Sequence, residues 1–215
     1  ILECKQSFER DLHSKDDDWF FYWITKDNTG KIKLLEYEKM FRALGKTKVA
    51  GIDEVGRGPL CGPVVASSVI LPENIDIPGL TDSKKISPKK RIGFYDEILD
   101  KAISVGIGII NEDRIDEINI LNATFEAMHE AIRNLNVEPE FLLIDGKTFK
   151  PYYTETNELI PLKCLIRGDD KYIPISCASI QAKVFHDQYI EKLCDELPES
   201  FYNKYDKIVC CLLYT

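Results

Sequence analysis

Three acidic residues directly follow short apolar stretches of the chain. Asp53 and Glu54 come after Val49-Ala50-Gly51-Ile52, and Asp145 comes after Phe141-Leu142-Leu143-Ile144. Each stretch is typical of a buried strand, and side chains at the C-terminal ends of strands in an open α/β sheet face the crevice where ligands bind. Acids in such a place need hydrogen bonds, a charged partner or a bound cation to offset lost hydration.

The chemistry of these acids favours a metal site. No histidine or cysteine adjoins Asp53, Glu54 or Asp145, and an all-oxygen set of ligands selects hard cations such as Mg²⁺ or Mn²⁺. The alternative is that each acid caps the turn that follows its strand. The pattern of acids leaves both interpretations open.

A glycine-rich turn follows Glu54. Gly56 and Gly58 flank Arg57, so backbone N–H groups can approach a polyanion closely while the guanidinium pairs with phosphate. Such turns are common, and this one alone is weak support for a phosphate site.

The elements that would position these residues alternate between strand and helix. Pro88 opens a helix with Ile92, Tyr95, Ile98, Leu99 and Ala102 on one face. A longer helical region, bent near 119–122, covers 113–135, and a last helix covers 176–196. Strands are expected at 49–53, 64–71, 103–110, 141–145 and 162–166. This alternation predicts an α/β domain built on one mixed sheet flanked by helices.

The chain divides by pattern into three parts. Residues 1–47 form an N-terminal extension in which apolar residues at helical spacing predict a short helix over 31–45. Residues 48–210 carry the alternating strands and helices of one domain. Residues 211–215 resemble a non-native tail and are set aside from fold reasoning.

Composition narrows the class of protein. Thirty-six acidic residues outnumber 28 basic ones, giving a net charge of −8, although nucleic-acid binding normally rests on Lys and Arg. Bound cations would offset the negative charge of clustered carboxylates. A local basic segment is also present, made of Lys84, Lys85, Lys89, Lys90 and Arg91. A solvent-exposed helix face would explain this basic segment equally well. No apolar run is long enough to span a membrane, and no leader segment is apparent, so we expect a cytoplasmic protein. We also expect the chain to be a monomer. The seven cysteines lack metal spacing and predict reduced, mostly buried thiols.

Four motifs, in order, resemble those of ribonuclease HII and span about residues 48 to 190. The segment Gly51-Ile52-Asp53-Glu54-Val55-Gly56-Arg57-Gly58-Pro59 matches the family signature nearly letter for letter, and Leu80-Thr81-Asp82-Ser83-Lys84-Lys85 resembles its LxDSKK motif. Leu143-Ile144-Asp145-Gly146 resembles the third motif. Gly168-Asp169-Asp170-Lys171, followed by Ile175-Ser176-Cys177-Ala178-Ser179-Ile180-Gln181-Ala182-Lys183-Val184, resembles the fourth. The resemblance implies a ribonuclease H-like fold.

Residue roles follow from this resemblance position by position. It implies Asp53, Glu54 and Asp145 as metal ligands for Mn²⁺ or Mg²⁺, and Asp169 as a fourth catalytic carboxylate, with Asp170 as the alternative. Gly56, Arg57 and Gly58 would form a loop that senses the 2′-hydroxyl of a ribonucleotide. The remaining implied substrate contacts are phosphate-binding lysines: Lys84, Lys85 and Lys183.

Two departures from the family pattern stand out. His186 occupies the position of a usual arginine, and the GYGTxxH-like motif expected after the last helix is absent before the sequence ends. We therefore expect a metal site that is retained and substrate binding that is weakened.

The implied activity is an endonuclease of DNA repair and replication. It would hydrolyse the RNA strand of RNA–DNA hybrids and cut 5′ of ribonucleotides embedded in duplex DNA by two-metal-ion catalysis. An inactive nucleic-acid-binding fragment and another acidic-site metal-dependent nuclease are the alternatives.

Overall fold

The computed structural model describes residues 45, 47–59, 62–73, 75, 77–80 and 86–196. The chain divides into two units, 1–47 and 48–215, and the helices and strands described belong to the second. The helix expected over 31–45, apart from Gly45, and the tail at 211–215 lie outside the described residues.

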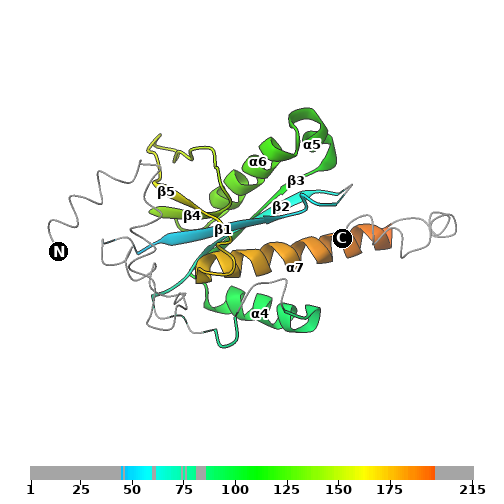
Figure 1. Ribbon diagram of the computed structural model, residues 1–215, viewed down its shortest axis with the longest axis horizontal. Coiled ribbons are helices and arrows are strands. Elements are labelled where there is room, and N and C mark those ends of the chain that lie inside the picture. The colour runs from blue at the N-terminus through cyan, green and yellow to red at the C-terminus, as the bar shows by residue number, and fades with distance from the viewer. Residues whose placement is uncertain are drawn as a thin grey trace. The chain divides into compact units, whose positions relative to one another are not determined.

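A five-stranded mixed sheet forms the centre of this unit (Figure 1). Its strands lie in the order β3-β2-β1-β4-β5, with β1 antiparallel to β2, β2 antiparallel to β3, and β4 parallel to both β1 and β5. All five predicted strands are therefore confirmed, with ends that move by one or two residues. Their bounds are β1 Val49–Val55, β2 Val64–Ile70, β3 Ser104–Ile110, β4 Phe141–Asp145 and β5 Leu162–Leu165.

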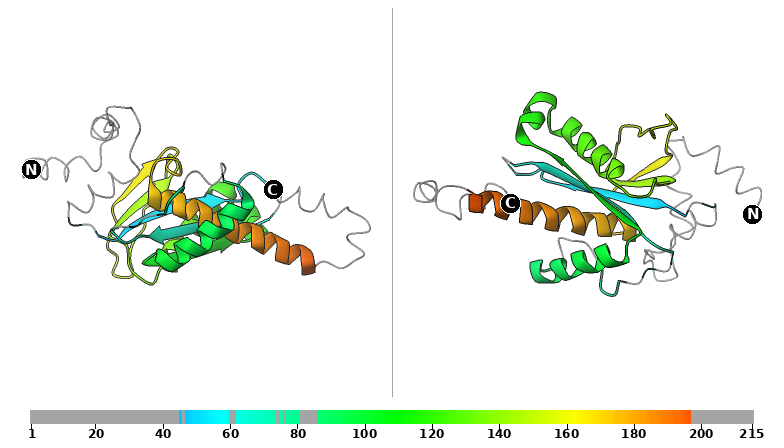
Figure 2. Two further views of the ribbon diagram at one scale, coloured as in Figure 1. Left: turned by 90° about the horizontal axis from the view of Figure 1, so that it is seen from below. Right: turned by 180° about the vertical axis from the view of Figure 1, so that it is seen from behind.

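Helices α5 (Glu112–Ile118) and α6 (Ile120–Arg133) lie on one side of the sheet (Figure 2). The predicted bend is confirmed at Asn119, which has a φ of 67° and whose side chain accepts hydrogen bonds from the backbone N–H groups of Leu121 and Asn122. Asn119 thereby ends one helix and caps the next. The apolar face of α6, including Ala127, Met128 and Ala131, packs against the sheet in one core cluster.

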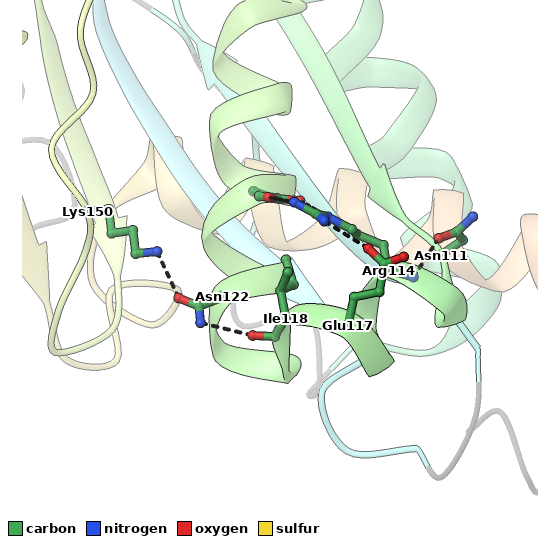
Figure 3. Close-up of polar contacts among 7 residues, drawn as sticks. Asn111, Arg114, Glu117, Ile118, Asn122 and Lys150 are labelled. Atoms are coloured by element: carbon green, nitrogen blue, oxygen red, sulfur yellow. Dashed lines mark hydrogen bonds and ion pairs between the residues drawn. The ribbon is translucent and has the colours of Figure 1, made fainter.

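Polar contacts hold α5 and the segment after β4 against α6 (Figure 3). Arg114 donates to both carboxylate oxygens of Glu126, at 3.0 and 2.7 Å, and to Glu117 at 2.9 Å. Lys150 donates to Asn122 Oδ1 at 2.8 Å. These contacts are exposed, so they orient the elements more than they stabilise the fold.

Helix α7 (Ile173–Glu196) covers the opposite face of the sheet, and α4 (Pro88–Lys101) packs on α7. Gly51 allows α7 to approach β1 without an intervening side chain. A Cβ atom at this position would lie 2.2 Å from the Pro174 carbonyl carbon. The N-terminal turns of α7 therefore lie directly against β1.

The prediction of which residues form the buried apolar face of α4 is partly wrong. Ile98 is buried as expected, and Tyr95 packs against the same core cluster, but Ile92 and Leu99 are 48% and 47% exposed. The reason is that α4 packs mainly on α7 alone, and a helix with one neighbour buries only a narrow stripe. Phe94, absent from the predicted face, contributes to that stripe.

Two composition-based predictions can be compared with the described part of the chain. Cys164, Cys177 and Cys194 are free thiols. Cys177 and Cys194 are buried as expected, whereas Cys164 is only partly buried. Among the helices described, none combines the length and apolar character required to cross a bilayer.

Candidate metal and nucleic-acid site

Two carboxylates come together because β1 and β4 are parallel neighbours. Ile52 is in register with Ile144, so Asp53 and Asp145 are the next residues along adjacent strands. Both isoleucines belong to the core cluster on the α6 face. Because side chains alternate along a strand, both acids are directed to the α7 face. Asp53 is buried there, and Asp145 is partly buried.

Glu54 is the next residue on β1 and by the same alternation begins on the α6 face. Its backbone N–H donates to Asp53 Oδ1 at 2.8 Å, and its Oε1 accepts from Arg57 Nη1 at 3.1 Å. Its Oε2 is buried, and none of the described residues is a hydrogen-bond partner of this oxygen. Glu54 therefore has one neutralised oxygen and one oxygen with unused capacity to bind a cation or donor.

The three carboxylates interact electrostatically. Burial raises the pKa of Asp53 well above its usual range, and the negative charges of Glu54 and Asp145 raise it further, against hydrogen bonds from the Ser179 hydroxyl and the Glu54 N–H. Burial also raises the pKa of Glu54, with Arg57 opposing and Asp145 adding to the effect. A group of acids with this mutual repulsion gains most from a nearby positive charge.

Asp169 lies in the loop between β5 and α7, and the residue before it, Gly168, contacts Asp145. The Gly168 N–H donates to Asp145 Oδ1 at 2.7 Å, which ties this loop to the end of β4. Asp169 is 5% exposed, whereas Asp170 is exposed. The fold thus separates two residues that the sequence left as alternatives and places Asp169 in the interior.

Two serines of α7 form hydrogen bonds with Asp53 or with the backbone of Asp169. Neither serine was among the site residues predicted from the sequence. The Ser179 hydroxyl donates to the Asp53 carboxylate, and the Ser176 hydroxyl donates to the backbone carbonyl of Asp169. The available signal was spacing, because Ser176, Ser179 and Lys183 fall at helical intervals of three and four and share one face.

The donor chemistry of this site fits a hard cation. The side chains offer carboxylate and hydroxyl oxygens, which are the ligands that Mg²⁺ and Mn²⁺ prefer, and Glu54 Oε2 is a buried oxygen in need of a partner. Among the described residues, no group of three or more His, Cys, Asp or Glu side chains lies in an arrangement that could hold a metal ion. Asp53 and Glu54 start on opposite faces of β1, and their mutual repulsion opposes closer approach. The metal site remains a prediction.

The predicted substrate contacts are placed only in part. Gly56, with a φ of 100°, and Arg57 follow β1. A Cβ atom at Gly58 would have none of the described residues within 4 Å, so the described part of this loop is open on that side. The Lys183 ammonium group lies 2.8 Å from the Asp187 carboxylate. Because this ion pair is partly exposed to solvent, a phosphate could replace Asp187 as the partner of Lys183. Lys84 and Lys85 lie outside the described residues.

His186, which stands where the family usually has arginine, is buried. Its Nδ1 is 3.7 Å from Asp187 Oδ1, and Arg91 Nη1 is 3.7 Å from the other oxygen of that carboxylate. The imidazole therefore contributes to packing between α7 and its surroundings and presents no surface to a phosphate.

Comparisons with known proteins agree on one family. The family model described as ribonuclease HII matches residues 50–203. Proteins named ribonuclease HII from Bacillus mycoides (strain KBAB4) and Bacillus thuringiensis (strain Al Hakam) are each 49% identical over 173 residues, which is 80% of this chain and 65% of the relative. The chain thus spans slightly less than two thirds of the length of these curated relatives.

Solved structures show the same fold, as the resemblance implied. The ribonuclease H2 of Pyrococcus horikoshii OT3 is similar with a TM-score of 0.61 and 27% identity, covering 76% of this chain and 92% of that one. The RNase HII in a complex with PCNA from Archaeoglobus fulgidus gives a TM-score of 0.56 at 27% identity, covering 69% and 77%. Since the family model covers well over half of the chain and the fold agrees, this chain belongs to the ribonuclease HII family.

Proposed function

We propose that this chain is a divalent-metal-dependent endonuclease that hydrolyses the RNA strand of RNA–DNA hybrids and cuts 5′ of ribonucleotides embedded in duplex DNA. The observation that carries the proposal is the parallel register of β1 and β4, which brings the buried carboxylate of Asp53 beside Asp145. The negative charges of Glu54 and Asp145 also raise the pKa of Asp53. Family membership provides the reaction class.

Asp53, Glu54 and Asp145 are the proposed metal ligands, and Asp169 is the proposed fourth carboxylate. When bound, Mn²⁺ or Mg²⁺, as a pair of ions, would supply Lewis acidity to the attacking water and to the leaving oxygen. The unpartnered Oε2 of Glu54 and the interior position of Asp169 support these assignments.

The chain's own basic groups would bind and orient the substrate. Arg57 extends from the loop after β1 and is held 3.1 Å from Glu54, so it can pair with a phosphate beside the acidic group. Lys183 lies one helical turn beyond Ser179 on the same face of α7. Its ammonium group can leave its ion pair with Asp187 and bind a second phosphate. Lys84 and Lys85 are proposed as further phosphate contacts.

Selectivity for RNA would come from shape and from the 2′-hydroxyl, because cleavage of a hybrid does not depend on base identity. The loop of Gly56, Arg57 and Gly58 is the proposed reader of that hydroxyl. Its open side at Gly58 allows close approach of a sugar, which a larger side chain would obstruct.

A cleavage assay tests this proposal. The substrate is a DNA duplex with one embedded ribonucleotide, incubated with the 215-residue chain with and without Mn²⁺, beside an all-DNA duplex as the control. We expect cation-dependent cleavage on the 5′ side of the ribonucleotide, leaving 3′-hydroxyl and 5′-phosphate ends. Binding without turnover would favour the non-catalytic alternative, and cleavage of the all-DNA duplex would favour another nuclease activity.

A further inference from the structure

The first turns of α7 are fixed against β1 by direct backbone packing. The space that a Cβ atom of Gly51 would occupy is taken by the backbone of Pro174 and Ile175, at 2.2 and 2.4 Å. Gly51 lies two residues before Asp53 on the same strand and therefore on the same face. The position of α7 over the acidic end of β1 is therefore determined by the fold and does not depend on the ions.

Ser176 and Ser179 are one helical turn apart on this fixed segment, and each contacts a different acidic segment. The Ser179 hydroxyl donates to the side chain of Asp53, and the Ser176 hydroxyl donates to the main chain of Asp169. Both serines are buried, with Ser179 7% exposed and Ser176 1% exposed. One short stretch of helix thus links strand β1 to the loop that precedes α7.

Asp53 requires such support because its neighbours repel it. Glu54 and Asp145 both carry negative charge next to it, and without a restraint the carboxylate would rotate to increase its distance from them. We infer that Ser179 is a positioning residue that holds the Asp53 carboxylate in the orientation needed for a cation, and that Ser176 supports Asp169 in the same way through its backbone. Partners that orient ligands in this manner contribute strongly to metal affinity.

This inference rests on the proposed metal site, and its test uses metal binding rather than cleavage. Mn²⁺ affinity of the 215-residue chain is measured by isothermal titration calorimetry without nucleic acid. Ser179→Ala removes the hydroxyl and is expected to weaken Mn²⁺ binding about 10-fold. Ser179→Thr keeps a hydroxyl at the same place and is expected to recover most of that affinity. Ser176→Ala, which acts through a carbonyl, is expected to have a smaller effect.

Ser68→Ala is the matched control. Ser68 is 0% exposed, lies on neighbouring β2 and is in register with Ile52 on the α6 face. Its hydroxyl has no hydrogen-bond partner among the described residues. The same atoms are therefore deleted from a serine that is also buried and whose hydroxyl forms no hydrogen bond to an acid in the described part of the chain. We expect wild-type Mn²⁺ affinity for this variant.

The possible outcomes separate the two proposals. A wild-type chain that binds no Mn²⁺ would overturn the metal site, and the positioning role with it. If wild type binds and Ser179→Ala binds equally well, the metal site stands and the positioning role is wrong. Equal losses in Ser179→Ala and Ser68→Ala, or in Ser179→Ala and Ser179→Thr, would also overturn it, since the loss would then come from packing and not from the hydroxyl.

Discussion

The two faces of the sheet are packed by helices in the same manner but with different chemistry. On one face, α6 approaches β3 so closely that a Cβ atom of Gly106 would lie 2.1 Å from the Ala131 carbonyl oxygen, and the surrounding side chains are apolar. On the other face, α7 approaches β1 at Gly51 equally closely, but the next turn carries serines that reach acidic groups. Close packing on the α6 face thus joins mainly apolar side chains, whereas close packing on the α7 face also brings serine hydroxyls to the acidic segments.

Replacing Asp53 with Asn tests the α7 face most directly. The substitution keeps the shape of the side chain but removes the charge of a proposed ligand, so cleavage of a single-ribonucleotide duplex should fall on the order of 100-fold or more. Initial rates in Mn²⁺ measure the effect. Asp116→Asn is the control, because Asp116 is exposed and lies on α5, on the opposite side of the sheet, and its rate should stay near that of wild type. Wild-type activity in Asp53→Asn would exclude Asp53 as a ligand.

A matched pair of glycine variants compares the two faces. Gly51→Ala and Gly106→Ala each place a methyl group within 2.2 Å of helix backbone, and each should lower the free energy of unfolding by about 1–3 kcal/mol or more. Only Gly51→Ala displaces α7 from the acidic group, so only this variant should also bind Mn²⁺ more weakly. Denaturant titration and calorimetry give the two quantities. Equal Mn²⁺ affinity in both variants would show that the α7 contact has no special relation to the site.

The Asp53→Asn variant should also be more stable than wild type when metal is absent. The folded-state pKa of Asp53 is raised, so the folded protein prefers the protonated form, and wild type loses stability as pH rises from the ordinary aspartate pKa toward that raised value. Asparagine does not ionise and avoids this loss. With chelator present, the melting temperature of the variant should exceed that of wild type at neutral pH.

This gain has a defined pH dependence. Below the ordinary pKa of an aspartate, Asp53 is protonated in both the folded and the unfolded chain, so the two melting temperatures should converge. A difference that persists in acid would mean that relief of charge is not its cause.

The smallest effect is expected at the exposed contacts beside α6. Arg114→Ala removes the bonds to Glu117 and Glu126, which are exposed to solvent and screened by salt. We expect a slight fall in melting temperature and unchanged Mn²⁺ affinity. A large loss of Mn²⁺ affinity in Arg114→Ala would contradict the idea that contacts beside α6 have no influence on the proposed metal site.

Much of the fold could be predicted because its signals are local. Strands β1 and β4 correspond to short apolar runs, Pro88 marks the start of α4, and Asn119 marks the break between α5 and α6. Each of these depends on the alternation of strands, the geometry of proline or the capping chemistry of asparagine, which act within a few residues. The acids of the candidate site are predicted in the same way, from their place at strand ends and from motif resemblance, and their role as metal ligands stays a prediction.

Other features depend on which segments become neighbours, and no local pattern encodes that. Ile92 and Leu99 have the spacing of a buried face but are exposed, because α4 packs mainly on a single helix. Asp169 and Asp170 are chemically identical in sequence, and only the fold of the loop against β4 makes one buried and the other exposed. Ser179 meets Asp53 across 126 positions of sequence, a contact set by the packing of α7 on Gly51. The types of residue that can bind a cation are therefore determined by the sequence, whereas their supporting partners are decided by tertiary structure, because a hydrogen bond acts only between groups that packing has already brought together.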